Sequence, residues 1–237
     1  MQDKSVDLIL TDPPYGIGIN QNSKPVGIAS NLSRMANDKT WDDNIPSAEY
    51  FKEMFRVSKN QIVFGANYFW ESFYSSPCYI IWDKRGNLPK VPFCDTEFAW
   101  TSFDKMPKKY TVINHGFIKD SNDEKTIHPT QKPSELFVNI LRDFAKDGQV
   151  IFDPFMGSGT AGVACERLGL SFIGCEISTE YFQIAERRIQ SAALQPSLFT
   201  PSNNRLHLTG GGLPATQSSF TAEVIPPAKL PDKSPRR

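Results

Sequence analysis

Cysteine and histidine are scarce in this chain, and their spacing provides no metal site or disulfide framework. The seven positions are Cys78, Cys94, Cys165, Cys175, His115, His128 and His207. No two cysteines form a C-x-x-C pair, and the histidines lie far from one another. Structural zinc sites and disulfide scaffolds use closer, recurring spacings. We therefore expect no metal, and the cysteine usage fits a reducing cytoplasm.

Long hydrophobic runs and an excess of charge of one sign are also absent. The N-terminal apolar run, residues 6–10, contains Asp7 and is too short for a signal peptide or a membrane span. The formal net charge is +0, whereas many nucleic-acid binders are strongly basic. A basic groove can still be local. We expect a cytoplasmic protein without membrane contact, and the charge alone does not decide about nucleic acid.

The 237 residues, 39% of them apolar, suit one globular domain with a tail. Residues 195–237 differ from the rest, because they hold seven of the 18 prolines and a Gly210-Gly211-Gly212 run. Their apolar residues show no period. We expect residues 1–194 to form the folded domain and residues 195–237 to form a flexible, disordered tail.

Within residues 1–194, short apolar runs alternate with helical patterns. The runs predict buried parallel strands at 6–10, 61–65, 79–82, 97–100, 150–152 and 172–175. Helices are predicted after Ser47, after Ser134 with Gly148 closing the helix, from Thr160 to Leu168 before Gly169, and after Ser178 or Thr179. This alternation predicts the α/β class, with a doubly wound, mostly parallel sheet. Segments 16–46 and 103–133 are predicted as long loops.

A glycine turn follows the strand at 150–152 and predicts a nucleotide-like ligand. Residues 150–162 read V-I-F-D-P-F-M-G-S-G-T-A-G, which contains a G-x-G-x-x-G. Such glycines permit a tight turn and close approach of the backbone to a ligand. The next strand ends at Glu176, whose carboxylate is expected to accept hydrogen bonds from ribose hydroxyls. Both NAD and S-adenosylmethionine fit this pattern, but Asp153 would repel a pyrophosphate and suits the cationic methionine end of S-adenosylmethionine.

A second motif, T-D-P-P-Y-G at residues 11–16, predicts a receptor for a planar amine. Pro13 and Pro14 lock the backbone and remove two N–H donors. The turn therefore presents two acceptors, the Asp12 carboxylate and the Pro13 carbonyl, beside the aromatic face of Tyr15. This arrangement suits the exocyclic NH2 of adenine or cytosine.

The chemistry of methyl transfer explains why such a turn is needed. The lone pair of an exocyclic amine is delocalised into the ring, so the amine is a poor nucleophile. Two acceptors for its hydrogens direct the lone pair toward a methyl sulfonium, and transfer is then an in-line displacement helped by positioning and electrostatics. The base must leave the helix stack to reach the pocket, where an aromatic side chain can stack on it.

Together these residues resemble the N6-adenine/N4-cytosine DNA methyltransferases in their permuted order, in which D-P-P-Y precedes the cofactor turn. The matching motifs are T-D-P-P-Y-G at 11–16, H-P-T-Q-K-P at 128–133, F-D-P-F-M-G-S-G-T at 152–160 and the E-I-S-x-x-Y-F run within 176–189. The resemblance covers residues 5–194. It implies a Rossmann-like fold, S-adenosyl-L-methionine as cofactor, double-stranded DNA as substrate and a role in DNA methylation of the restriction-modification kind, by a monomer or homodimer.

The resemblance also assigns residues to roles. The catalytic motif comprises Asp12, Pro13, Pro14 and Tyr15. The cofactor-binding residues are Asp153, Phe155, Gly157, Ser158, Gly159, Thr160 and Glu176. The segment 128–133 is expected to pack against the methionine end of the cofactor. An aspartate in the first position of D-P-P-Y favours adenine N6 over cytosine N4 as the acceptor.

The chain departs from the family pattern at its N-terminus. Relatives carry a further strand and an acidic residue before the catalytic strand, whereas Met1 stands only a few residues before it here. Either the chain is truncated, or another segment fills the gap. A sheet without this strand would expose an edge.

Target recognition is expected from the two long loops, chiefly the segment 103–133. Its lysines, which could contact phosphates, are Lys105, Lys108, Lys109, Lys119, Lys125 and Lys132. Two alternatives remain open at this point. One is a methyltransferase acting on RNA or on a protein amide, and the other is a degenerate or truncated chain that binds DNA or a partner without turnover.

Overall fold

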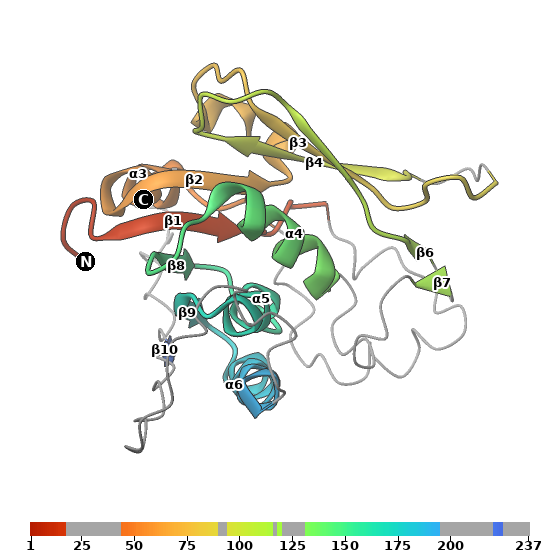
Figure 1. Ribbon diagram of the computed structural model, residues 1–237. Coiled ribbons are helices and arrows are strands. Elements are labelled where there is room, and N and C mark those ends of the chain that lie inside the picture. The colour runs from red at the N-terminus through yellow and green to blue at the C-terminus, as the bar shows by residue number, and fades with distance from the viewer. Residues whose placement is uncertain (18–43, 90–93, 116–117, 120–130, 195–219, 225–237) are drawn as a thin grey trace, which may run out of the picture.

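The computed structural model describes residues 1–17, 44–89, 94–115, 118–119, 131–194 and 220–224. In these residues, eight strands form one sheet in the order β10-β9-β8-β1-β2-β4-β3-β5 (Figure 1). The strands of this sheet are β1 (Val6–Thr11), β2 (Ser58–Phe64), β3 (Tyr79–Asp83), β4 (Thr96–Thr101), β5 (Lys108–Thr111), β8 (Val150–Asp153), β9 (Ser171–Glu176) and β10 (Phe220–Val224). A separate ribbon pairs β6 (Asn114–His115) with β7 (Ile118–Lys119).

The sheet is mostly parallel, as the sequence predicts. β4 is antiparallel to its neighbours β2 and β3, and the other pairings of this sheet are parallel. The carboxyl ends of β1, β2, β3, β8 and β9 therefore meet at one edge, which we call the carboxyl edge. Because β4 runs the other way, its first residues lie at this edge as well.

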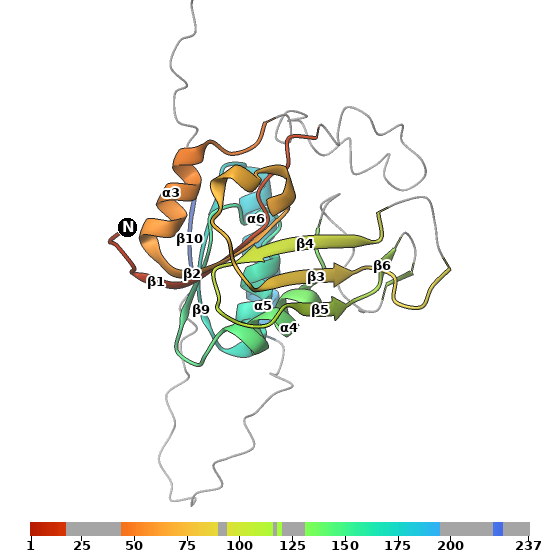
Figure 2. The ribbon, with the colours of Figure 1, turned by 90° about the horizontal axis from the view of Figure 1, so that it is seen from above.

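Helices cover both faces of the sheet (Figure 2). One face carries α3 (Ala48–Val57), and the other carries α4 (Ser134–Phe144), α5 (Thr160–Leu168) and α6 (Thr179–Leu194). Two short turns, η1 (Ala66–Tyr68) and η2 (Trp70–Ser72), follow β2. The described helices include none that is long and apolar enough to cross a bilayer.

Each face of the sheet has its own hydrophobic core, so β1 is buried on both sides. Leu8 and Leu10 pack in the core shared with α4, α5 and α6, whereas Ile9 packs in the core under α3. Full burial of such a side chain contributes about 1.5–3 kcal/mol relative to exposure. This two-sided burial explains why the strand reads as a continuous apolar run, and the doubly wound fold class is confirmed.

All six predicted strands are present, but two details of the helices differ from expectation. α4 ends at Phe144, with Ala145 as its C-cap residue, and Gly148 (φ +76°) lies in the turn that follows. Ser134 is the first residue of α4 after the N-cap Pro133, and its hydroxyl accepts a hydrogen bond from Arg167 at 2.8 Å instead of capping the helix. The predicted stop at Gly169, with φ +68°, is observed.

The predicted loop 103–133 contains regular structure. β5 adds to the sheet beside β3, and β6 and β7 follow it. The sequence K-K-Y-T of β5 is mostly exposed at the sheet edge, so it lacks the apolar run that marks a buried strand. Residues 18–43 of the other predicted loop lie outside the described residues.

β10 was not predicted, because it belongs to the segment expected to be a tail. It pairs in parallel with β9, with Phe220 opposite Phe172 and Val224 opposite Glu176. This strand forms the outer edge of the sheet beside β9. The rest of the predicted tail lies outside the described residues.

Candidate active site

The carboxyl edge of the sheet brings the two sequence motifs together. β1 leads into the D-P-P-Y turn, and its neighbour β8 leads into the glycine turn. Thr11, the last residue of β1, donates a hydrogen bond from its hydroxyl to Asp153 Oδ1 at 2.6 Å. The predicted amine receptor and the predicted cofactor loop are thus direct neighbours.

The glycine turn is held by two carboxylates at the ends of β8 and β9. Asp153 Oδ1 also accepts a hydrogen bond from the backbone N–H of Phe155 at 3.1 Å. Glu176 accepts one backbone N–H on each oxygen, from Gly157 and from Ser178, both at 2.8 Å. These contacts fix the path of the turn before any ligand binds.

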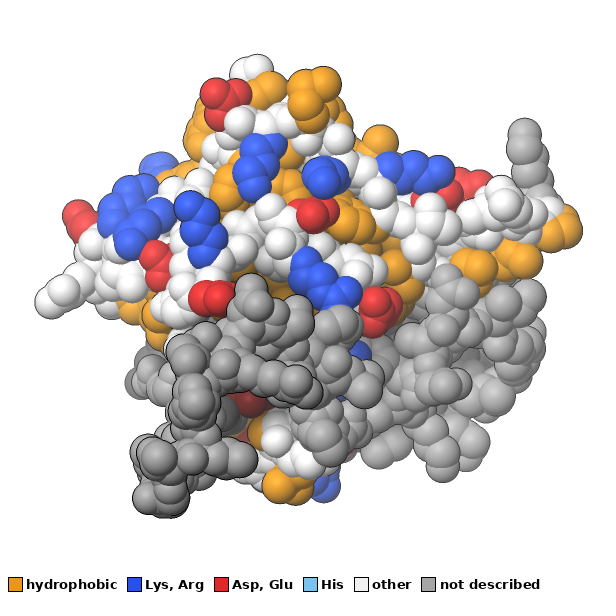
Figure 3. Space-filling model, in the orientation of Figure 1, with side chains coloured by type: hydrophobic (Ala, Val, Ile, Leu, Met, Phe, Trp, Pro, Cys, Tyr) orange, Lys and Arg blue, Asp and Glu red, His pale blue; other side chains and the backbone are white. Residues whose placement is uncertain are grey.

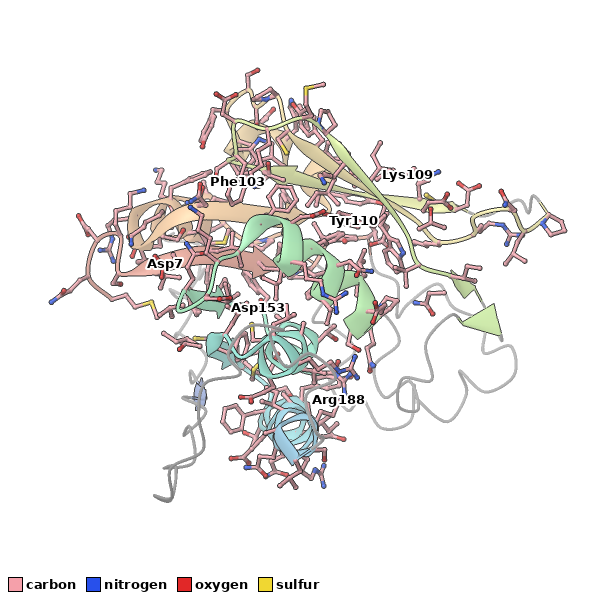
Figure 4. The ribbon with its side chains drawn as sticks, viewed as in Figure 1. Asp7, Phe103, Lys109, Tyr110, Asp153 and Arg188 are labelled. Atoms are coloured by element: carbon pink, nitrogen blue, oxygen red, sulfur yellow. The ribbon has the colours of Figure 1, made fainter. Side chains whose placement is uncertain are left out.

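Arg188 of α6 supports the same turn and was not identified from the sequence. It is 4% exposed, and one guanidinium nitrogen donates to the Ser158 hydroxyl at 3.1 Å and to the Ser158 carbonyl (Figure 4). The only sequence signal is a charged residue next to Ile189 on the buried side of an amphipathic helix. A buried arginine at this position pins the turn to the last helix.

The turn fits S-adenosylmethionine on three observations. A Cβ added at Gly157 would meet no atom closer than 4.0 Å, so the backbone (φ +53°) borders open space. Each Glu176 oxygen keeps a lone pair beyond the one used by the backbone, which suits ribose hydroxyls. Burial raises the pKa of Asp153 to about 7, and a bound cation would favour its ionised form.

The D-P-P-Y turn presents a carboxylate that is already engaged on both oxygens. The Tyr15 hydroxyl donates to Asp12 Oδ1 at 2.6 Å, and the Lys132 ammonium donates to Asp12 Oδ2. Lys132 also donates to the Tyr15 hydroxyl at 3.3 Å. The Asp12 side chain is 24% exposed, so a ligand can still reach it.

A second carboxylate, Glu97 of β4, lies on the other side of Lys132. Its Oε2 is 3.0 Å from the Lys132 ammonium, and its Oε1 is 2.5 Å from the Lys84 ammonium. Burial opposes the charge of Lys132, but Asp12 and Glu97 together raise its pKa above the ordinary value. Burial raises the pKa of Asp12, and the neighbouring ammonium of Lys132 counteracts this rise.

Tyr15 is held in place by two residues that follow β2. It stacks on Tyr68 of η1, with ring centroids 4.8 Å apart and planes inclined by 14°. On Gly65 (φ +67°), an added Cβ would lie 1.9 Å from Tyr15 Cε1, so only glycine allows this approach. Tyr68 is 44% exposed, which leaves an aromatic surface open at the carboxyl edge.

The predicted residues are therefore largely gathered at one edge, and Thr160 joins the glycine turn to the H-P-T-Q-K-P motif. The Thr160 hydroxyl at the start of α5 donates to the Lys132 carbonyl at 3.4 Å. Phe155 contacts Tyr50 of α3, with ring centroids 5.7 Å apart. Of the segment 128–133, residues 128–130 lie outside the described residues.

Three residues of this site carried no assigned role from the sequence: Glu97, Tyr68 and Arg188. Lys132 was expected to contact phosphates, but it is 5% exposed and pairs with Asp12 and Glu97 instead. Lys132 stands in the H-P-T-Q-K-P motif, which was the one available signal. Glu97 is a charged residue near the start of the otherwise mostly apolar strand β4, and a charge in such a place is expected to have a charged partner. Nothing in the sequence placed either of them beside Asp12.

The lysines of the predicted recognition segment mostly contact the protein itself in the described residues. Lys109, labelled in Figure 4, pairs with Asp83 at 2.8 Å, and Lys108 pairs with Asp143 at 3.2 Å. Exposed pairs of this kind contribute only about 0–1 kcal/mol, so they can exchange for phosphates. Basic and acidic side chains are interspersed over the face shown in Figure 3.

Comparison with known proteins agrees with this geometry. A family model described as "DNA methylase", of the N6/N4 type, matches residues 75–187. The chain is 29% identical over 236 residues to type II methyltransferase M2.DpnII of Streptococcus pneumoniae, covering 81% of this chain and 85% of that protein. It is 26% identical over 239 residues to type II methyltransferase M.HpaI of Haemophilus parainfluenzae, covering 81% and 70%.

A solved structure shares the fold, and a second one is similar in sequence. PvuII DNA methyltransferase, described as cytosine-N4-specific, matches with a TM-score of 0.51 and 16% identity, over 84% of this chain and 83% of that one. A crystal structure of M1.HpyAVI with S-adenosylmethionine is 28% identical, over 78% and 89%, with a TM-score of 0.49. The family match, the curated relatives and the order of the motifs lead to one conclusion: the chain is similar to the N6-adenine/N4-cytosine DNA methyltransferases.

Proposed function

We propose that this enzyme transfers a methyl group from S-adenosyl-L-methionine to adenine N6 in double-stranded DNA, in preference to cytosine N4. DNA is the substrate class of the family, and S-adenosyl-L-methionine is its methyl donor. The observation that carries the choice of base is Asp12, a carboxylate in the first position of D-P-P-Y at the carboxyl edge. Serine is more typical of the cytosine-N4 enzymes at this position. The fold itself supports neither base over the other, because the PvuII enzyme shares it.

In the proposed reaction, Asp12 and the Pro13 carbonyl each accept a hydrogen bond from one N–H of the target amine. The lone pair of the nitrogen is then directed away from the ring and toward the methyl donor. Tyr15 provides the stacking surface for the extruded base, and its contacts with Gly65 and Tyr68 hold the ring rigid. When bound, the cofactor supplies an activated methyl group on a cationic sulfonium.

The residues proposed to hold the cofactor are those of the glycine turn and the two strand ends beside it. They are Asp153, Phe155, Gly157, Ser158, Gly159, Thr160 and Glu176. Glu176 is proposed to bind the ribose while it holds the Gly157 N–H, so its two roles are linked. Asp153 is proposed to face the cationic methionine end.

The test is incubation of the purified chain with methyl-labelled S-adenosylmethionine and duplex DNA of mixed sequence, followed by nucleoside analysis. We expect label in N6-methyladenine, and an Asp12→Ala enzyme should give none while still binding cofactor. Asp147→Ala is the matched control, because Asp147 is exposed in the turn before β8 at the opposite edge. Its activity should equal that of the wild type.

Three results would contradict the proposal in different ways. Label in N4-methylcytosine would change the proposed target base from adenine to cytosine and leave the proposed chemistry unchanged. Equal turnover by Asp12→Ala would remove Asp12 from the reaction. Label appearing in RNA or protein but not in DNA would replace the substrate class, and no label in any acceptor would mean that the chain binds without turnover.

A further inference from the structure

Lys132 is a buried charge at the active site. Its side chain is 5% exposed, and its ammonium contacts Asp12, Glu97 and Tyr15. The ammonium also lies over the Tyr15 and Phe64 rings, 5.6 and 5.1 Å from their centroids. A buried ammonium is unfavourable unless charged or polar partners compensate its lost hydration. Here every surrounding group favours the charged form.

The charges around Lys132 form a chain that alternates in sign. Lys84 lies beside Glu97, Glu97 beside Lys132, and Lys132 beside Asp12. Each group comes from a different part of the fold: the end of β3, the start of β4, the residue before the N-cap of α4 and the turn after β1. The formal charges of the four groups cancel, so the site buries a neutral set instead of a lone carboxylate.

We propose that Lys132, held in place by Glu97, is a positioning residue for methyl transfer that keeps Asp12 in the carboxylate form and fixes its orientation toward the target amine. This inference rests on the proposed function of Asp12 as acceptor. A protonated Asp12 would present a hydroxyl donor to an amine that needs an acceptor. Burial and the nearby negative charges push Asp12 toward that protonated state, and the Lys132 ammonium opposes them.

The groups that face Asp12 determine the direction of the effect. Tyr15 comes from its own turn, Lys132 from the segment before α4, Glu97 from β4 and Asp153 from β8. Tyr68 stacks behind Tyr15, and Lys84 stands behind Glu97. Without Lys132, the carboxylates of Glu97 and Asp153 would both disfavour ionisation of Asp12. The pH below which activity is lost should then rise by about 1–3 units, the range typical for a close opposite charge.

The experiment measures single-turnover methylation of duplex DNA against pH for the wild type, Lys132→Met, Lys132→Arg and Glu97→Gln. Lys132→Met should move the acid limb of the profile upward by at least about one pH unit. Lys132→Arg should leave the acid limb closer to the wild-type position than Lys132→Met does, because arginine keeps the positive charge. Glu97→Gln keeps an acceptor for Lys132 and removes one negative charge, so the limb should move to lower pH.

These opposite shifts separate positioning from a merely structural role. Loss of folding or packing would lower the rate at every pH without moving the limb, and cofactor binding measured by calorimetry checks that the variants fold. Lys146→Met is the control, because Lys146 is exposed in the turn after α4 and should leave the profile unchanged.

The inference is overturned if Lys132→Met keeps the wild-type limb, or if Glu97→Gln and Lys132→Met shift it in the same direction. Its failure is distinguishable from failure of the proposed function. An inactive wild type refutes the function, whereas an active wild type with an unmoved limb in the variants refutes only the role of Lys132.

Discussion

The hydroxyl of Thr11 donates a 2.6 Å hydrogen bond to Asp153, which joins the strand before the D-P-P-Y turn to the strand before the glycine turn. The two strands are also paired directly, with Leu8 opposite Ile151 and Ile9 opposite Phe152. Methyl transfer requires the amine and the methyl donor to be aligned closely. Because β1 pairs with β8, the proposed amine receptor and the proposed cofactor loop lie next to each other.

Cofactor affinity should increase with pH around neutrality, because of Asp153. Burial raises the pKa of this carboxyl to about 7, and a cationic ligand binds better to the ionised form. If only that form binds, affinity falls about tenfold for each pH unit below the pKa. Calorimetric titration with S-adenosylhomocysteine, which carries the same amino-acid end, between about pH 6 and about pH 8 measures the slope, and Asp153→Asn should flatten it.

The raised pKa of Asp153 also predicts how the stability of the ligand-free protein depends on pH. A carboxyl whose pKa is higher in the folded state than in the unfolded state stabilises the fold when protonated. That contribution is complete below its ordinary value of 3.8 and is lost as the pH rises through about 7. Thermal denaturation of the wild type should follow this trend, and Asp147→Asn should behave like the wild type. A cofactor affinity that is flat with pH would show that Asp153 does not face the cationic end.

Gly65→Ala should abolish methylation while cofactor binding is retained. The new Cβ would lie 1.9 Å from Tyr15 Cε1, so the ring must move away from Asp12 and Tyr68. Overpacking and the left-handed backbone together should destabilise the protein by about 1–3 kcal/mol. Urea denaturation measures the stability, and the labelled-DNA assay measures the activity.

Gly169→Ala is a matched control for this variant. Gly169 has nearly the same backbone angle (φ +68° against +67°), but a Cβ there meets no atom within 4 Å. The two variants share the backbone strain and differ in the clash with Tyr15. If both lose activity to the same extent, the position of Tyr15 does not explain the loss.

The sequence predicts the buried strands of this fold better than the exposed ones. The apolar stretches at residues 8–10, 62–64 and 150–152 mark β1, β2 and β8, which have a hydrophobic core on each face of the sheet. β5 lies at an edge and is mostly polar, and β10 belongs to a segment rich in proline and glycine. Such strands are stabilised by pairing with a neighbour, which no local pattern reveals.

The active-site residues also fall into some that the sequence predicts and some that it does not. Asp12, Asp153 and Glu176 could be predicted to meet, because they stand at the ends of parallel strands. Glu97 reaches the same edge only because β4 is antiparallel, and that direction is not encoded in its apolar residues. Lys132 approaches Asp12 from 120 residues away, through the packing of α4 against the sheet.

Truncation tests whether β10 is part of the cofactor half of the sheet. A chain ending at Leu194 loses the strand that pairs with β9 along its whole length, up to Glu176. The lost backbone hydrogen bonds should lower the free energy of unfolding by roughly 1–4 kcal/mol, at about 0.5–1.5 kcal/mol for each bond. Cofactor affinity should fall as well, because Glu176 holds the Gly157 N–H and ends the strand that loses its neighbour.

A chain ending at Val224 is the matched control, since it keeps β10 and should equal the full chain in urea denaturation and in calorimetry. Ala222→Pro in the full chain adds a point test, because it places a proline in the middle of β10, opposite Gly174, without shortening the protein. If the chain ending at Leu194 matches the full chain in both measurements, residues 195–237 are a tail without a structural role. If it loses stability and cofactor affinity together, and Ala222→Pro does the same, β10 is a structural part of the sheet edge beside β9.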